Sequence, residues 1–137
     1  MRYFIPAISI ALFALTACSG PDIYEADDIL HGTGDIEVEV HSFIELDLEV
    51  DDVIGRNKLE RVSAQFMLTN DEDTPMRLRI TWSWRDADGM QLRAAAGPKA
   101  EQEIVLRADE SRTFTFTSPS ALAVKFTAEI NQNSALR

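Results

Sequence analysis

Apolar and polar residues alternate most strictly along residues 76–85, MRLRITWSWR. Every second position from Met76 to Trp84 is apolar, and the positions between them are arginine, threonine or serine. A period of two over this length predicts a β-strand with one face in a core and the other in water. Because Trp82 and Trp84 have the largest apolar side chains of this stretch, we expect both tryptophans to lie in the core.

The turn after this strand is predicted to be a three-residue loop, Ala87-Asp88-Gly89. This register places Trp84 opposite Leu92, whereas a two-residue turn would place it opposite Arg93 and mix the two faces. Three-residue hairpin loops usually contain one residue in the left-handed conformation, which suits Gly89. We therefore expect a hairpin with a glycine bulge.

The same alternation predicts strands in most of the remaining chain. Residues 35–41 and 43–52 are expected to form one long strand with a bulge or bend at 41–43, and further strands are expected over 62–69, 104–106, 114–116 and 124–130. Residues 54–58 are expected to form a turn, and Ser118-Pro119 to begin a short helical turn. A five-residue loop would place Ile104 opposite Phe114. Seven or eight short strands separated by turns are typical of an antiparallel β-sandwich.

The two ends of the chain lack this pattern. Residues 1–17, MRYFIPAISIALFALTA, have the charged and apolar regions of a signal peptide. A transmembrane anchor is less favoured, because the apolar run is short and contains Pro6. We expect residues 18–34 to be a tether that begins with a lipidated cysteine, residues 35–131 to be the sandwich domain and residues 132–137 to be a polar tail.

The single cysteine directly follows the apolar run. Leu15-Thr16-Ala17-Cys18 resembles the lipobox of bacterial lipoproteins, in which cleavage before the cysteine exposes it to lipid modification. A lone cysteine cannot form an intramolecular disulfide, so an exported chain would use it otherwise. Ser19 resembles the signal for onward transport to an outer membrane. We expect acyl chains such as palmitate on Cys18 to hold the protein on the outer membrane, facing the periplasm.

Charge narrows the possible partners. The chain has 23 acidic residues against 13 basic ones and a net charge of −10, which argues against nucleic acid as a partner and suits a basic protein. Four acids alternate within residues 43–52: Glu45, Asp47, Glu49 and Asp51. Three interpretations stay open for this face: it is solvated, it pairs with Arg77, Arg79 and Arg85 across strands, or it binds a cation.

Patterns typical of catalysis are absent from the sequence or incomplete in it. The sequence contains no phosphate-binding glycine loop and no nucleophile elbow. His41 beside Glu39 and the run 71–73 (DED) are each better interpreted as ordinary surface residues than as metal ligands. Asp86 to Gly89 opens like a calcium loop but lacks the later ligands of an EF-hand. We therefore expect no enzyme activity, no cofactor and no metal.

The segment from Leu68 to Leu92 resembles the central motif of the YcfL-like family of small bacterial lipoproteins. The matching positions are Asn70, Trp82, Trp84, Asp86 and Gly89. The resemblance implies an immunoglobulin-like sandwich, no known catalytic activity and a role in the cell envelope. The favoured function is a membrane-anchored, non-enzymatic interaction module with an envelope protein as partner. The alternatives are a structural lipoprotein of a secretion machine and a cation-binding lipoprotein that uses the acidic face.

Overall fold

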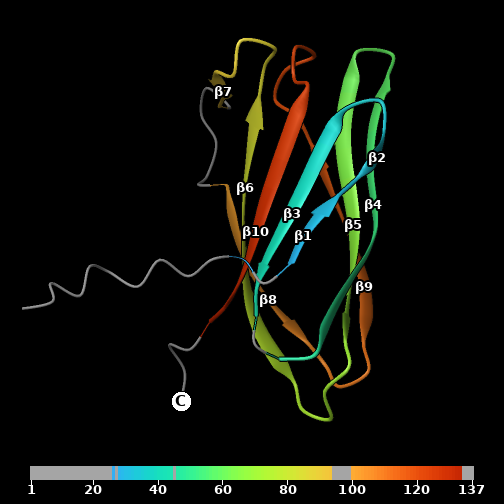
Figure 1. Cartoon of the computed structure of the whole chain (residues 1–137), viewed down its shortest axis with the longest axis vertical. Coiled ribbons are helices and arrows are strands. Elements are labelled where there is room, and N and C mark those ends of the chain that lie inside the picture. Colours follow the sequence, from blue (N-terminus) through green and yellow to red (C-terminus); the bar gives the residue numbers. More distant parts are fainter. Residues whose placement is uncertain (1–25, 27, 45, 94–99, 134–137) are drawn as a thin grey trace, which may run out of the picture.

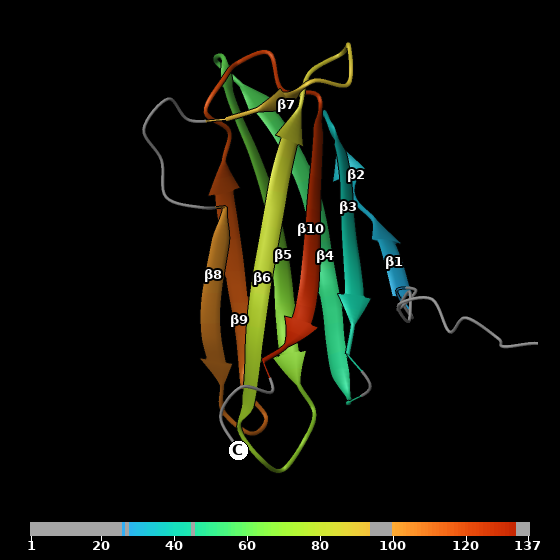
Figure 2. The same cartoon turned by 90° about the vertical axis from the view of Figure 1, so that its left-hand side faces the viewer.

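Ten β-strands form two facing sheets in the computed structural model, which describes residues 26, 28–44, 46–93 and 100–133 (Figures 1 and 2). The described residues contain no helix, and so none with the length and apolar composition needed to cross a membrane. The all-β sandwich predicted from the sequence is confirmed.

The first sheet has six strands in the order β1-β3-β10-β6, with β7 and β8 both paired to β6. Their bounds are β1 Asp28–His31, β3 Glu37–Phe43, β10 Lys125–Gln132, β6 Met76–Arg85, β7 Gln91–Leu92 and β8 Glu101–Leu106. The second sheet has the order β2-β4-β5-β9. Its strands are β2 Thr33–Gly34, β4 Leu48–Lys58, β5 Arg61–Asn70 and β9 Ser111–Thr117.

Both sheets are mixed, so the expectation of purely antiparallel pairing is wrong. β10 runs parallel to β3, and β2 runs parallel to β4, while the other pairs are antiparallel. The parallel pair β3–β10 joins strands from opposite ends of the chain, and its register begins with Glu37 opposite Lys125. Alternation along one segment reveals its faces but not its distant neighbours, so this pairing had no local signal.

The core lies between the two sheets and follows the predicted alternation. In β5 and β6 the buried side chains occupy every second position over most of the strand. Trp84 is 3% exposed and packs on Phe126, with ring centroids 4.7 Å apart. Trp82 is only half-buried and packs on Phe116 at the same centroid distance. One tryptophan is therefore a core residue, and the other covers the edge of the core.

The predicted hairpin between β6 and β7 is confirmed. Trp84 lies opposite Leu92, and the Asp86 amide donates to the Met90 carbonyl at 3.0 Å. Gly89 has a φ of 78°, the left-handed conformation that glycine adopts at least cost. The Asp86 carboxylate also accepts the amides of Asp88 and Met90, which closes the turn.

The expected long strand over 35–52 is in fact two strands in different sheets. β3 ends at Phe43, and β4 begins at Leu48 after the chain has crossed to the second sheet. The turn expected at 54–58 is also wrong, because β4 continues to Lys58 and turns at Leu59–Glu60, both with positive φ. Gly55 is instead needed for packing, since a Cβ there would lie 2.4 Å from Ile36 Cγ1.

Two further expectations are corrected near the end of the chain. β8 pairs with β6 and β9 pairs with β5, so Ile104 lies opposite Leu78 and not opposite Phe114. The side chains of Ile104 and Phe114 are both buried because each faces the space between the sheets. Residues 118–122 form hydroxyl-stabilised turns in place of a helical turn, with Ser118 Oγ accepting the Ser120 amide at 3.2 Å.

The domain also begins earlier than the expected boundary at residue 35. β1 and β2 lie within the predicted tether, and each pairs with a strand of the sandwich. Leu30 packs against the core, and Gly34 meets Gly55 so closely that a Cβ would lie 2.0 Å from the Gly55 carbonyl oxygen. At the other end, β10 includes Gln132 of the expected tail.

Candidate functional site

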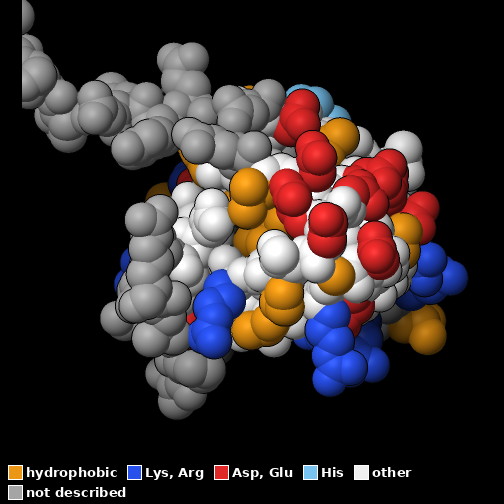
Figure 3. Space-filling model, turned by 90° about the horizontal axis from the view of Figure 1, so that it is seen from below, with side chains coloured by type: hydrophobic (Ala, Val, Ile, Leu, Met, Phe, Trp, Pro, Cys, Tyr) orange, Lys and Arg blue, Asp and Glu red, His pale blue; other side chains and the backbone are white. Residues whose placement is uncertain are grey.

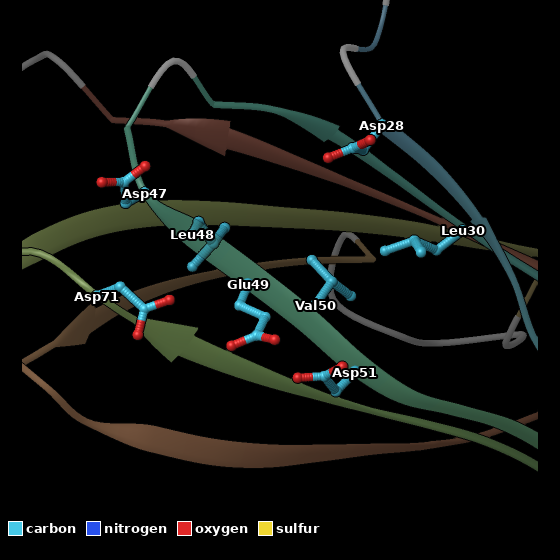
Figure 4. Close-up of a pocket in the computed structure, with 8 residues that line it drawn as sticks. All are labelled: Asp28, Leu30, Asp47, Leu48, Glu49, Val50, Asp51 and Asp71. Carbon is cyan, nitrogen blue, oxygen red and sulfur yellow. The ribbon is translucent and has the colours of Figure 1, made fainter.

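An open groove of about 560 Å³ lies between β1 and β4, where an edge of one sheet meets an edge of the other (Figure 4). β1 is the outermost strand of the first sheet. On the second sheet, β2 covers the edge of β4 only at Ile54 and Gly55. Among the described strands, none pairs with this edge of β4 along Leu48–Asp51. The groove is lined by Asp28, Leu30, Asp47, Leu48, Glu49, Val50, Asp51 and Asp71.

The floor of the groove is apolar. Alternation in β4 turns Leu48 and Val50 toward the core, and Val50 is 9% exposed. Leu30 comes from β1, where it lies opposite Val40 of β3, and points toward Val50 (Figure 4). These three side chains pack against the main core while still lining the groove.

The rim of the groove is acidic. The alternation that buries Leu48 and Val50 places Glu49 and Asp51 on the outer face of β4, and Asp47 lies just before this strand. Asp71, just after β5, is held beside β4 because its amide donates to the Asp47 carbonyl at 3.0 Å. Asp28 contributes a fifth carboxylate from β1. Seen from the lower end of the sandwich, acidic side chains gather on one side, with apolar ones among them (Figure 3).

The neighbouring carboxylates affect the ionisation of Glu49. Its side chain lies between Asp51 and Asp71 (Figure 4). The negative charge of Asp51, and then that of Asp71, raises the pKa of Glu49 above its ordinary value. Within the part of the chain that the structure describes, no Lys or Arg forms an ion pair with a groove carboxylate. A cationic partner would therefore relieve an existing repulsion.

Of the three interpretations of this acidic face, pairing with the arginines of β6 is wrong. Arg77, Arg79 and Arg85 belong to the first sheet, away from β4. The Nε atom of Arg79 lies 3.5 Å from Glu101 on the neighbouring strand β8. Of the four acids singled out in the sequence, Asp47, Glu49 and Asp51 line the groove, whereas Glu45 lies outside the described residues.

A second charged cluster occupies the outer face of β3 and β10. Lys125 Nζ lies 2.9 Å from carboxylate oxygens of both Glu37 and Glu39, and His41 Nε2 lies 3.3 Å from Glu39. The hydrogen bond from Lys125 is the main reason why the pKa of Glu39 falls below its usual value. Across the described residues, no group of three or more His, Cys, Asp or Glu is arranged to hold a metal ion. The pair of His41 and Glu39 is thus part of an ion-pair network around Lys125.

The motif residues of β5, β6 and their turns support the fold and lie outside the groove lining. Asn70 is fully buried, and its Nδ2 donates to the carbonyls of Thr74, Leu106 and Arg107 at 2.9–3.3 Å. Its Oδ1 accepts the Glu72 amide at 3.0 Å. Trp82, Trp84, Asp86 and Gly89 form the strand and hairpin already described.

Sequence reasoning missed the contributions of Asp28, Leu30 and Asp71 to the site. The first two lie in the segment predicted to be a tether, and Asp71 lies in a run that the sequence pattern indicates to be ordinary surface residues. The isolated apolar pair Ile29-Leu30 within an acidic segment was the signal for β1, although it gave no indication that this strand would face β4. The lipobox residues Leu15, Thr16 and Ala17, together with Cys18 and Ser19, lie outside the described residues.

Comparisons with known proteins identify a matching family and similar crystal structures. A family model described as "Protein of unknown function (DUF1425)" matches residues 37–132. The structure is similar to the crystal structure of a DUF1425 family member from Shewanella sp. pv-4, with 15% identity, a TM-score of 0.55, and coverage of 77% of this chain and 89% of that one. It is also similar to Campylobacter jejuni cj0090, with 16% identity, a TM-score of 0.52, and coverage of 69% and 97%. No curated protein matches the sequence.

Proposed function

The chain belongs to the DUF1425 family, whose function is unknown, and we propose that it is a lipid-anchored protein of the bacterial cell envelope that acts as a non-enzymatic interaction module. The groove between β1 and β4 is the interaction surface. It is the feature on which this proposal depends, because it combines an unpaired strand edge, an apolar floor and five carboxylates without an ion-pair partner in the described residues.

Exposed strand edges are normally shortened, covered or otherwise protected, because their free backbone groups bind other strands. Among the described residues, no strand covers the edge of β4 along Leu48–Asp51, and acidic side chains lie on its outer face. Negatively charged side chains repel strands that carry negative charge and attract strands that carry positive charge. This selectivity is what an interaction module requires, and it needs no catalytic group.

The sequence motifs support the anchoring and the finer family assignment. Leu15-Thr16-Ala17-Cys18 fits lipidation at Cys18, and Ser19 fits transport to the outer membrane. Asn70, Trp82, Trp84, Asp86 and Gly89 fit the motif of YcfL-like lipoproteins. We infer that the protein is an outer-membrane lipoprotein of this type, with its domain in the periplasm.

Site-specific photo-crosslinking in intact cells tests the interaction. The full-length chain is produced with p-benzoylphenylalanine in place of Leu48, inside the groove, or in place of Thr115, which is exposed on the outer face of β9. Irradiation should give a discrete adduct with one protein from the position in the groove and not from the control position. Mass spectrometry of the adduct then identifies the partner.

A second crosslinking position keeps this test decisive if p-benzoylphenylalanine in place of Leu48 perturbs folding. Asp28 is exposed on the other wall of the groove, so its replacement leaves the core intact. If Leu48, Asp28 and Thr115 all give the same faint, heterogeneous pattern in folded protein, the groove is not the interaction surface and the proposed function is wrong.

A further inference from the structure

We propose that the groove binds an extended, basic segment of a partner protein, which adds to the second sheet as a strand beside Leu48–Asp51 of β4. This inference rests on the proposed function and names the chemistry of the partner. Three separate features of the site lead to it: the free backbone edge, the alternation of side chains along β4, and the sign of the charge.

The backbone N–H and C=O groups of β4 point in the direction needed for strand addition. The Asp47 carbonyl accepts the Asp71 amide, so the odd-numbered groups of this segment face β5. In an antiparallel ladder successive residues point their backbone groups to opposite sides, so those of Val50 face the groove. The register with β5 is regular from Leu48 to Asp51 and shifts only after Asp51. An incoming strand thus meets a short edge without a bulge.

The side chains of β4 specify an alternating partner. Neighbouring strands of a sheet place cross-strand side chains on the same face. Residues opposite Leu48 and Val50 would enter the apolar floor beside Leu30, whereas residues opposite Glu49 and Asp51 would lie on the acidic outer face. The best occupant therefore alternates an apolar residue such as valine with lysine or arginine. Recognition by strand addition uses backbone hydrogen bonds for affinity and alternate side chains for specificity.

The charge of the groove disfavours a second copy of this chain that would pair through its own β4 edge. The chain has a net charge of −10, and its own exposed edge at β4 has Glu49 and Asp51 on the outer face. Two such edges would place like charges opposite each other, which destabilises a strand pair. A basic segment gains the opposite interaction with the same residues. The partner is accordingly a different protein with an exposed, positively charged strand or tail.

Peptide binding to the full-length protein in a non-ionic detergent tests this inference. The probe is a fluorescein-labelled peptide of alternating lysine and valine, about nine residues long, and the readout is fluorescence anisotropy. A matched peptide has N-methyl groups on alternate backbone nitrogens, which keep the charge but remove the donors of one edge. A glutamate–valine peptide reports on the sign of the charge, and empty micelles report on non-specific partition.

Two matched variants locate the binding. Glu49→Gln/Asp51→Asn removes two acids spaced two apart on β4, and Glu101→Gln/Glu103→Gln removes two with the same spacing on β8. We expect the dissociation constant of the lysine–valine peptide to rise about tenfold or more for the first variant and to change less than about twofold for the second. N-methylation should weaken binding by about tenfold as well, and the glutamate–valine peptide should not bind.

Any one of four results would overturn strand addition. Equal binding of the N-methylated peptide would mean that charge attraction acts without backbone pairing. Equal loss of affinity in both variants would mean that binding follows net charge and not the groove. Stabilisation of the wild type by calcium alone, absent from Glu49→Gln/Asp51→Asn, would identify a cation site in place of a peptide site. If no peptide binds but Leu48 still crosslinks to one partner, the inference fails while the proposed function stands.

Discussion

Asn70 connects the end of β5 to two loops, although no charge or cofactor is involved. Its buried side-chain Nδ2 donates to three backbone carbonyls, and its Oδ1 accepts one backbone amide. Its backbone amide donates to the Glu110 carbonyl at 3.0 Å. Leaving buried polar groups without partners costs far more than one hydrogen bond gains. Asn70 also fixes the loop from which Asp71 reaches the groove, so a structural residue positions part of the candidate site.

Replacing Asn70 with alanine should therefore be severe. We expect Asn70→Ala to lower the free energy of unfolding by about 2–4 kcal/mol, because several buried backbone groups lose their partner together. Urea denaturation measures the change. Asn57→Ala is the matched control, since Asn57 is exposed and its hydrogen bond to Asp35 uses the backbone amide. Equal stability of Asn70→Ala and Asn57→Ala would refute the role given to Asn70.

At the scale of elements, the two acidic strand faces differ in how their charge is balanced. On β3, Glu37 and Glu39 share Lys125 from the parallel neighbour β10. On β4, the charges of Asp51 and Asp71 raise the pKa of Glu49, and no described Lys or Arg forms an ion pair with it. The sequence pattern predicted one long strand for the two segments that carry these faces. The crossing of the chain between the sheets separates them into a balanced face and an unbalanced one.

The balanced face should stabilise the protein at neutral pH. The folded-state pKa of Glu39 lies below its ordinary value of 4.5, so its stabilising contribution is present above that pH and disappears as the pH falls through the folded-state value. We expect Glu39→Gln to reduce stability by about 1 kcal/mol at pH 7, as is usual for a partly exposed ion pair. Urea titrations from pH 7 downward should show the difference shrinking. A deficit independent of pH would contradict this prediction.

The unbalanced face should behave in the opposite way. Because Glu49 binds its proton more tightly in the folded state, the repulsion acts above its folded-state pKa and disappears as the pH falls through it. Glu49→Gln/Asp51→Asn should therefore be as stable as the wild type at pH 7 or slightly more stable, and the two should converge in acid. Thermal melts over the same pH range measure this. A clear loss of stability at pH 7 would show that these acids have a stabilising partner.

At the scale of the whole molecule, the groove lies close to the expected anchor. Only the segment between Cys18 and Asp28 separates the expected lipid from the first groove residue. Fully extended, a segment of this length reaches about 35 Å. A partner in the groove would consequently be held near the membrane surface, which suits proteins that work on or near that membrane.

Lipidation of Cys18 is directly testable. Cys18→Ser should remove the acceptor of the acyl chains, so an uncleaved or soluble precursor should accumulate. Membrane fractionation followed by immunoblotting separates the two forms, and Ser118→Ala is a control that leaves the lipobox intact. Normal recovery of Cys18→Ser in the outer-membrane fraction, with normal processing, would contradict lipid anchoring.

The sequence predicted those features of the fold that depend on the alternation of apolar and polar residues within one segment. The bounds of β6, its hairpin and the inward face of β5 follow from period-two patterns and one glycine, so all three were predicted correctly. Sheet membership depends on contacts between distant segments, so the parallel pair β3–β10 and the separation of β8 from β9 were not predicted. The groove belongs to this second group, because Leu30, Val50 and Asp71 come together only through the arrangement of the sheets.

The most direct test of the interaction surface repeats the crosslink from Leu48 in a neutralised groove. The full-length chain is compared with and without the substitutions Asp47→Asn, Glu49→Gln, Asp51→Asn and Asp71→Asn, and with Glu101→Gln/Glu103→Gln as the charge control. We predict that the adduct disappears only when the groove is neutralised, while protein level, folding and membrane association stay unchanged. An adduct of equal yield from the neutralised groove would contradict the claim that its acids bind the partner.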